Sequence, residues 1–356
     1  MSAVPISIVP FVIFLAVCAA FAIGYEIIRF FEKRAARKAQ AAEPEQCEPP
    51  VNGTAAPTQS WRARDRYWIN ALLLLLTLGS TTLVGARLSA NFQANRPAFE
   101  IDSLVGSVLQ IATTPRALLP GFWFSLPLLF ILLAHESGHY FACQFYGVDA
   151  SLPYFIPAPT FLGTLGAFIR IRAPIYSKRV LFDIGVAGPI AGFVALLPIL
   201  AIGLAYSKVI PGIANQGDLV CGNPLLLRLL DRLIFPGVPT ADIYLHPAAR
   251  AAWWGLLATA LNLLPIGQLD GGHILYAFVG RRHKLLSKIF IAVLVPLGFL
   301  WWYGWLVWAG LLMFFGMRHP AIYDAARIGP GRTKLGWLAL TIFLLSFTLA
   351  PVTSAL

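Results

Sequence analysis

Two histidines and a glutamate lie within five consecutive positions of an apolar stretch, in the order His135, Glu136, Ser137, Gly138, His139. Residues four apart share one face of a helix, so both imidazoles can bind the same metal ion. Glu136 is placed to take a proton from a metal-bound water rather than to bind the metal. The alternative is a structural pair of buried histidines beside a glutamate that neighbouring helices satisfy.

A third ligand is expected elsewhere, because catalytic zinc usually has three protein ligands and an open position for water. Asp270, in the segment Leu261–His273, is the best candidate. Pro265 and Gly267 are expected to break a helix before it, and the two glycines after it allow close approach of the backbone. The sequence predicts one Zn²⁺ per chain, bound by the two histidines and this aspartate.

The composition indicates a polytopic membrane protein. Of the 356 residues, 58% are hydrophobic and 12% charged, with mean hydropathy +0.72. Soluble domains have about 45–50% apolar and about 25% charged residues, and disordered chains are more polar still. The net charge of +11 comes from short basic clusters between apolar runs. This pattern is typical of a chain oriented in a lipid bilayer by its loops, and we expect no nucleic-acid partner.

We expect an all-α polytopic fold with about eight transmembrane helices. Apolar stretches of about 18 or more residues indicate spanning helices. A run from 285 to 317 is too long for one span, and Pro296, Gly298 and the tryptophan cluster 301–305 are expected to divide it. The other spans are expected near 6–28, 68–86, 121–146, 180–206, 251–265 and 335–350.

The basic residues predict the orientation. With the N-terminus outside, 20 of the 27 Lys and Arg residues fall in cytoplasmic loops and 7 outside. Cytoplasmic loops normally carry this excess. Counted at 1.5 Å per residue from the outer ends of their spans, His135 lies at roughly 21–26 Å and Asp270 at roughly 28 Å. Both are therefore expected near the cytoplasmic face of a hydrocarbon core about 30 Å thick.

Three segments, taken together, resemble the site-2 protease family of intramembrane zinc metalloproteases. They are H-E-S-G-H at 135–139, G-V-A-G-P-I-A-G at 185–192 and N-L-L-P-I-G-Q-L-D-G-G at 262–272. The G-Q-L-D-G-G form of the third segment and the stretch 153–172 resemble in particular the branch that includes the chloroplast EGY-type proteases and their bacterial relatives. From this resemblance we expect an integral multi-pass protein of a bacterial cytoplasmic membrane.

The resemblance implies roles for individual residues. His135, His139 and Asp270 would bind zinc, and Glu136 would be the catalytic general base. Asn262 would hydrogen-bond the substrate backbone or the developing oxyanion, although an interhelical hydrogen bond explains it equally well.

Three neighbouring residues are considered as contributors to the site. Cys143 shares the face of His139 and is either a fourth ligand or a small buried hydrophobe. His273 is expected not to bind the metal. Asp183 either contacts the ligands or caps its own helix, and the glycines within 185–192 are expected to permit close helix approach.

The resemblance covers about residues 118–320 and divides the chain. We expect an N-terminal transmembrane anchor at 1–28, a basic and Pro/Ala/Glu-rich cytoplasmic tether at 29–67, and a second span with an outer loop at 68–117. A catalytic membrane core follows at 118–320, and a cytoplasmic loop with the last span at 321–356.

Two loops flank the expected core helices. Ile169 and Ile171 alternate with arginines, a period of two that predicts a strand and, within 153–172, a small β-hairpin near the cytoplasmic side of the site. It either holds an unwound substrate by strand addition or is a plain surface hairpin. The outer loop, 207–250, is too short for the PDZ domain that some family members carry.

These expectations together predict an intramembrane zinc endopeptidase. Its substrate would be a transmembrane protein, cleaved in or near a membrane-spanning helix during regulated intramembrane proteolysis. One alternative is a proteolytically silent homologue that acts as a binding or chaperoning module. Another is a metal or ion transporter, for which intramembrane polar groups would be spread through the membrane thickness. The substrate's identity and the oligomeric state are not determined by the sequence.

Overall fold

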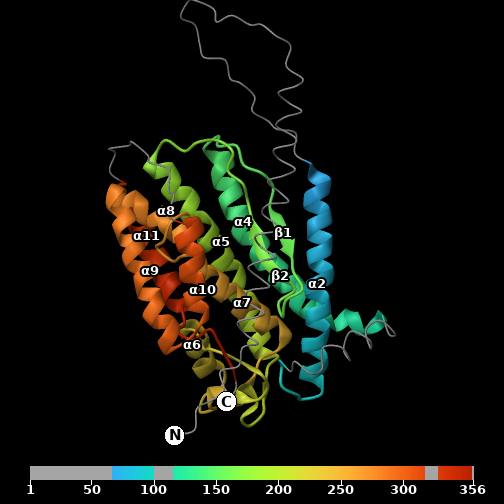
Figure 1. Ribbon diagram of the computed structural model, residues 1–356. Coiled ribbons are helices and arrows are strands. Elements are labelled where there is room, and N and C mark those ends of the chain that lie inside the picture. Colours follow the sequence, from blue (N-terminus) through green and yellow to red (C-terminus); the bar gives the residue numbers. More distant parts are fainter. Residues whose placement is uncertain (1–65, 100–114, 317–327, 355–356) are drawn as a thin grey trace, which may run out of the picture.

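The computed structural model describes residues 66–99, 115–316 and 328–354. The expected anchor at 1–28 and nearly all of the tether at 29–67 lie outside these ranges. The described chain is mostly helical, and its longer helices run side by side (Figure 1). The helices are α2 (Tyr67–Gln93), α4 (Phe122–Phe145), α5 (Lys178–Ala205), α6 (Leu225–Ile234), α7 (Pro247–Asn262), α8 (Asp270–Val279), α9 (His283–Leu300), α10 (Gly304–Leu311) and α11 (Pro330–Ser346).

Short helical turns and strands connect them. The turns are η1 (Pro115–Gly121), η2 (Ile213–Asn215), η3 (Thr240–Asp242), η4 (Gly280–Arg282) and η5 (Leu312–Gly316). The strands are β1 (Tyr154–Pro157), β2 (Thr164–Phe168), β3 (Lys208–Val209), β4 (Leu219–Cys221), β5 (Ile243–Tyr244) and β6 (Val352–Ser354). They form the antiparallel pairs β1–β2, β3–β5 and β4–β6.

Four helical segments among the described residues are long and apolar enough to cross a membrane. They are α2, Arg116–Phe145, α5 and α9. α7, α10 and α11 have 16, 8 and 17 residues and are shorter than a full span. The long run after 285 divides between Leu300 and Gly304, as the sequence predicts. The count of eight spans stays a prediction.

The centre of the bundle is formed by α4, α5 and α7. α4 and α5 make the most extensive helix–helix contact, and α7 packs against both. α7 is apolar on nearly all sides, and 12 of its 16 residues are buried. A helix with this composition belongs in an interior, which explains why a segment shorter than a span is stable here.

The ends of the central helices define two ends of the molecule. At one end, the rings of Trp123, Tyr206 and His246 meet, with centroids 5.5 to 6.5 Å apart. They belong to the start of α4, the end of α5 and the residue before α7, so α4 and α7 run parallel and α5 runs antiparallel to them. Residues equally far along α4 and α7 therefore lie at similar depth.

The hairpin expected within 153–172 is present. β1 and β2 pair antiparallel with Tyr154 opposite Phe168, and a register shift follows Phe155. Regular pairing ends at Phe168, after which one isolated bridge joins Ala150 to Ile171. The alternation at residues 169–172 therefore predicted a regular strand longer than the one that the structure has.

Side chains of α2 fix this hairpin in place. The Asn70 amide donates to the carbonyl oxygens of Leu152 and Pro153 at 3.2 and 3.0 Å, and the Ser80 hydroxyl donates to Gly163 O at 2.6 Å. These bonds anchor both the entry and the turn of the hairpin, between α2 and α4 (Figure 1).

Candidate metal centre

Helix α4 presents His135 and His139 on one buried face. Both imidazoles are directed to the same point, with their Nε2 atoms 3.2 Å apart. Spacing of four residues on a continuous α-helix produces this arrangement, as predicted. Both residues are buried, so water does not compete freely for their nitrogens.

Asp270 meets the two histidines from a distant part of the chain. It is the first residue of α8, and its Oδ2 lies 3.2 Å from Nε2 of both histidines. Tetrahedral ligand atoms at 2.0–2.1 Å from one zinc ion are about 3.3 Å apart. Among the residues that the structure describes, these three form the one group of three or more potential metal ligands. Their triangle fits a zinc ion.

A break between α7 and α8 brings Asp270 to this position. The chain leaves α7 at Asn262 and turns through Gly267, which has φ of 56° and so requires glycine's freedom. Gly271 and Gly272 pack directly on backbone carbonyls of this turn, where a Cβ would overlap them. The helix is therefore not continuous from residue 251 to Asp270, as the 28 Å depth estimate assumed, and the carboxylate lies level with the histidines.

Helix α5 orients the His139 ring. Nδ1 of His139 lies 2.7 Å from Ile184 O, and only a protonated Nδ1 can donate to this carbonyl. The bond leaves the lone pair of Nε2 available to a metal, as the outer hydrogen bonds of metal-binding histidines usually do. Gly188 packs against this ring and Gly192 against His135. Gly188 and Gly192 thus allow α5 to approach α4 closely, as the sequence predicts.

Glu136 lies beside the ligands but outside the ligand group. It is buried, and the backbone amide of Ile169 lies close to its carboxylate. Ile169 directly follows β2, so the hairpin reaches the predicted general base. The sequence motif identified Glu136, but its contact with the hairpin had no sequence signal.

Asn262 ends α7 next to the first histidine. Its Nδ2 lies 3.3 Å from His135 Nε2, which places the amide at the edge of the potential metal site. From Pro247 to Asn262 and from Phe122 to His135 the chain advances 15 and 13 residues along parallel helices. The parallel helices therefore place Asn262 and His135 at similar depth.

The other residues considered lie outside the ligand group. Cys143 is buried in an apolar cluster with Ala150 and Ile184, which favours the small hydrophobe over the fourth ligand. His273 is also outside the group, and its Cβ faces Gly185.

The expectation that Asp183 caps its own helix is wrong. Ser177 caps α5 by accepting from the Arg179 amide. Asp183 instead accepts from Arg332 of α11, with Nη2 to Oδ2 at 2.6 Å, and from the Tyr146 hydroxyl at 2.5 Å. The bond to Asp183 raises the pKa of Tyr146, which lies just beyond α4.

A membrane-embedded helical bundle with an H-E-x-x-H helix and a converging aspartate defines a metallopeptidase-type centre. The sequence profile of peptidase family M50 matches residues 123–303 of the 356-residue chain, which therefore belongs to this family, the site-2 proteases. The resemblance drawn from the motifs is confirmed.

Curated plant proteins share most of the chain. The chain is 32% identical over 317 residues to "Probable zinc metalloprotease EGY1, chloroplastic" of Arabidopsis thaliana, covering 83% of this chain and 54% of that protein. The rice protein of the same name is 32% identical over the same length, and Arabidopsis EGY2 is 29% identical over 266 residues, 72% of this chain and 45% of EGY2. The chain thus spans about half the length of the curated relatives it matches. Their names say chloroplastic, so they do not support the expected bacterial membrane.

Proposed function

We propose that the chain is an intramembrane zinc endopeptidase that hydrolyses a peptide bond in or near a transmembrane helix of another membrane protein. The observation that carries this proposal is the 3.2 Å triangle of His135, His139 and Asp270 with Glu136 beside it. Membership of peptidase family M50 supports the same chemistry. One zinc ion per chain would occupy the triangle, inside the catalytic core at 118–320.

The proposed chemistry divides between the ion and Glu136. Zinc, when bound, polarises the scissile carbonyl and lowers the pKa of the attacking water. Glu136 takes a proton from this water and gives it to the leaving amine. Its position supports this role, since it lies between the two histidines in the sequence and its carboxylate lies close to the Ile169 amide.

Asn262 is proposed to steady the substrate carbonyl. Its amide lies 3.3 Å from His135 Nε2 and can donate to an oxygen that approaches the ion. A donor that is already in place when negative charge develops on that oxygen stabilises the transition state. The alternative, a purely interhelical hydrogen bond, predicts that Asn262 affects stability but not the rate of cleavage.

The β1–β2 hairpin is proposed to hold the substrate. A helical substrate keeps its carbonyls in hydrogen bonds four residues apart, so the scissile segment must unwind before hydrolysis. An extended segment can add to a strand edge through backbone hydrogen bonds. The approach of Ile169 to Glu136 favours this role over that of a plain surface hairpin, because strand and base then meet the same stretch of substrate.

Zinc content and cleavage, measured on the same purified proteins, test the proposal. Glu136→Gln should keep stoichiometric zinc and lose cleavage of a single-span substrate by about 10² to 10⁴-fold, the usual contribution of a general base. Asp270→Asn and His139→Ala should lose zinc as well as cleavage. Ser137→Ala, in the same turn of α4, is the matched control and should retain both.

Two results would contradict the proposal. Wild-type cleavage by the Glu136→Gln protein would remove Glu136 from the mechanism. A wild-type protein that binds zinc but cleaves no membrane-embedded substrate would favour the silent homologue.

A further inference from the structure

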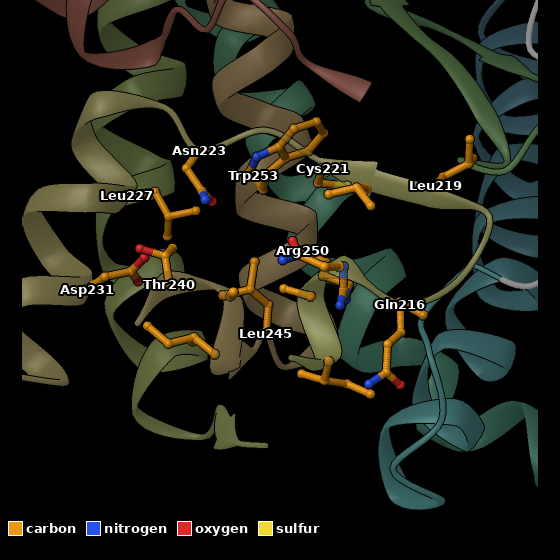
Figure 2. A pocket seen from close by; sticks show the side chains of 17 residues that line it. Gln216, Leu219, Cys221, Asn223, Leu227, Asp231, Thr240, Leu245, Arg250 and Trp253 are labelled. Carbon is orange, nitrogen blue, oxygen red and sulfur yellow. The ribbon is translucent and has the colours of Figure 1, made fainter. Parts of the chain in front are cut away.

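A second candidate site lies far from the metal centre. A cavity of about 170 Å³ opens among β4, α6 and the first turns of α7, in the segment expected to be the outer loop (Figure 2). Arg250 of its wall precedes Asn262 by 12 residues, or about 18 Å along α7 at 1.5 Å per residue. None of the proposed metal ligands lines this cavity.

The first feature of this cavity is a buried carboxylate. Asp231 of α6 is only 4% exposed, and both of its carboxylate oxygens are buried without a hydrogen-bond partner among the described residues. An unpaired buried carboxylate is costly, and native proteins normally satisfy such groups. Figure 2 shows Asp231 among the residues that line the cavity.

The second feature is a guanidinium group without an acceptor. Arg250 lies 5.6 and 5.4 Å from the ring centroids of Phe99 and Tyr244. These contacts stabilise its positive charge, but they satisfy none of its five N–H donors. Within the described part of the chain, Arg250 forms neither a side-chain hydrogen bond nor an ion pair. A planar guanidinium with free donors is suited to bidentate binding of a carboxylate.

The two charged groups face one cavity but do not pair with each other. Leu227, Leu245 and Trp253 also line the cavity, so apolar wall accompanies the charged positions (Figure 2). A cavity of about 150 Å³ holds a molecule the size of benzene, so this one admits a small organic ligand.

We propose that this cavity is a binding site for a small zwitterion, a molecule with one carboxylate, one ammonium group and a short hydrocarbon part. The carboxylate binds the Arg250 guanidinium, the ammonium donates to Asp231, and the hydrocarbon packs on the leucines and Trp253. Free amino acids with apolar side chains belong to this class. Such a ligand satisfies both unpaired groups at once, which neither an anion nor a cation does.

Binding to the full-length, zinc-loaded protein tests this site. Isothermal titration at pH 7.5 with leucine would be compared with isovalerate, which has only the carboxylate, and isoamylamine, which has only the ammonium group. We expect leucine to bind at least about tenfold more tightly than either, because each analogue leaves one buried charge unpaired. A series with 4-aminobutyrate shows whether a longer separation of charges fits better.

Matched variants assign the two contacts. Asp231→Asn should reduce leucine affinity to that of isovalerate and leave isovalerate binding unchanged. Arg250→Lys keeps the charge but loses the paired donors, and it should weaken both leucine and isovalerate. Arg232→Gln alters an exposed neighbour on the same helix and should change neither.

Three outcomes would overturn the proposal. They are no binding of either zwitterion at millimolar concentration, equal affinity for zwitterions and analogues, and zwitterion binding unaffected by both Asp231→Asn and Arg250→Lys. The first would leave a cavity that holds water only.

Discussion

At the scale of single residues, the proposed metal centre depends on two glycines whose lack of a side chain leaves room for the histidine rings. The His139 ring occupies the space that a side chain at Gly188 would fill, and His135 packs closely on Gly192, where an added Cβ would be 3.0 Å from the Cβ of His135. Both glycines are on α5, opposite the ligand helix. The close approach also brings Ile184 O within 2.7 Å of the His139 ring. Gly188 and Gly192 therefore position the two histidines that are proposed to bind the metal.

Gly188→Ala should damage the metal site without unfolding the bundle. The added methyl group overlaps the imidazole of His139 and must turn this ring away from His135 and Asp270. Disturbing the groups that orient a metal ligand typically costs 10 to 100-fold in affinity, so we expect about this loss in zinc titrations. Gly79→Ala is the control, because a methyl group there meets open space on α2. Equal zinc affinity for both variants would contradict the positioning role.

The buried carboxyl group of Asp231, which lies outside the membrane-spanning segments, makes the stability of the protein depend on pH. Burial raises the pKa of its carboxyl group from 3.8 to about 6. The folded protein therefore holds this proton more tightly than the unfolded chain. The free energy of unfolding must fall as the pH rises from about 4 to above 6, and the whole cost of the buried charge is present at pH 8.

Asp231→Asn should consequently stabilise the protein at pH 8 and have little effect near pH 4.5. The gain is at most about 3 kcal/mol, since one pKa unit corresponds to about 1.4 kcal/mol. Thermal unfolding in detergent, with no zwitterion added, measures this gain. The Tm of the Asp231→Asn protein should lie several degrees above that of the wild type at pH 8 only. A Tm difference independent of pH would show that burial of the charge is not the cause.

At the scale of elements, patterns within one helix could be predicted and contacts between distant segments could not. The spacing of His135 and His139 is a property of α4 alone, and Pro265 and Gly267 indicate where α7 and α8 separate. The ion pair of Arg332 with Asp183 joins residues 149 positions apart. Sequence spacing carries no signal for it, which is why Asp183 was assigned a capping role that belongs to Ser177.

The hairpin shows the same limit. Alternation of isoleucine and arginine predicted a strand over 169–172, but regular pairing ends at Phe168, and the chain beyond it bends to bring the Ile169 amide to Glu136. Nothing local in the sequence encodes this contact. It depends on the way α2 holds the hairpin against α4.

Loosening the hairpin should therefore reduce cleavage while leaving the metal site intact. The double variant Asn70→Ala, Ser80→Ala removes the side-chain bonds from α2 to Leu152, Pro153 and Gly163. We expect faster hydrogen exchange at 150–172, lower cleavage of a helical substrate and unchanged zinc content. Thr341→Ala, which removes an exposed bond within α11, is the control. If hydrogen exchange becomes faster but cleavage is unchanged, the β1–β2 hairpin is a plain surface hairpin with no role in substrate binding.

At the scale of the whole molecule, described residues from three of the basic loops that the sequence assigns to one side lie at one end of the bundle. Arg332, from the loop and helix after residue 318, pairs with Asp183 near the start of α5. Lys178, also at that start, lies beside Gly280, where α8 passes into η4. The rings of Trp123, Tyr206 and His246 meet at the other end. These described residues thus lie at the same end of the fold, in agreement with the side that the sequence assigns to them, and the cytoplasmic orientation of that end stays a prediction.

Single-cysteine labelling should separate these two sides. In a chain without its four native cysteines, Tyr176→Cys and Lys284→Cys place a thiol at exposed positions of the basic end, and Asn215→Cys places one at the opposite end. If the basic end faces the cytoplasm when the chain is inserted in a bacterial inner membrane, spheroplasts treated with an impermeant maleimide should label Asn215→Cys alone. The other two should react only after the membrane is opened. Labelling of all three from outside would contradict the topology and, with it, a substrate cut near its cytoplasmic end.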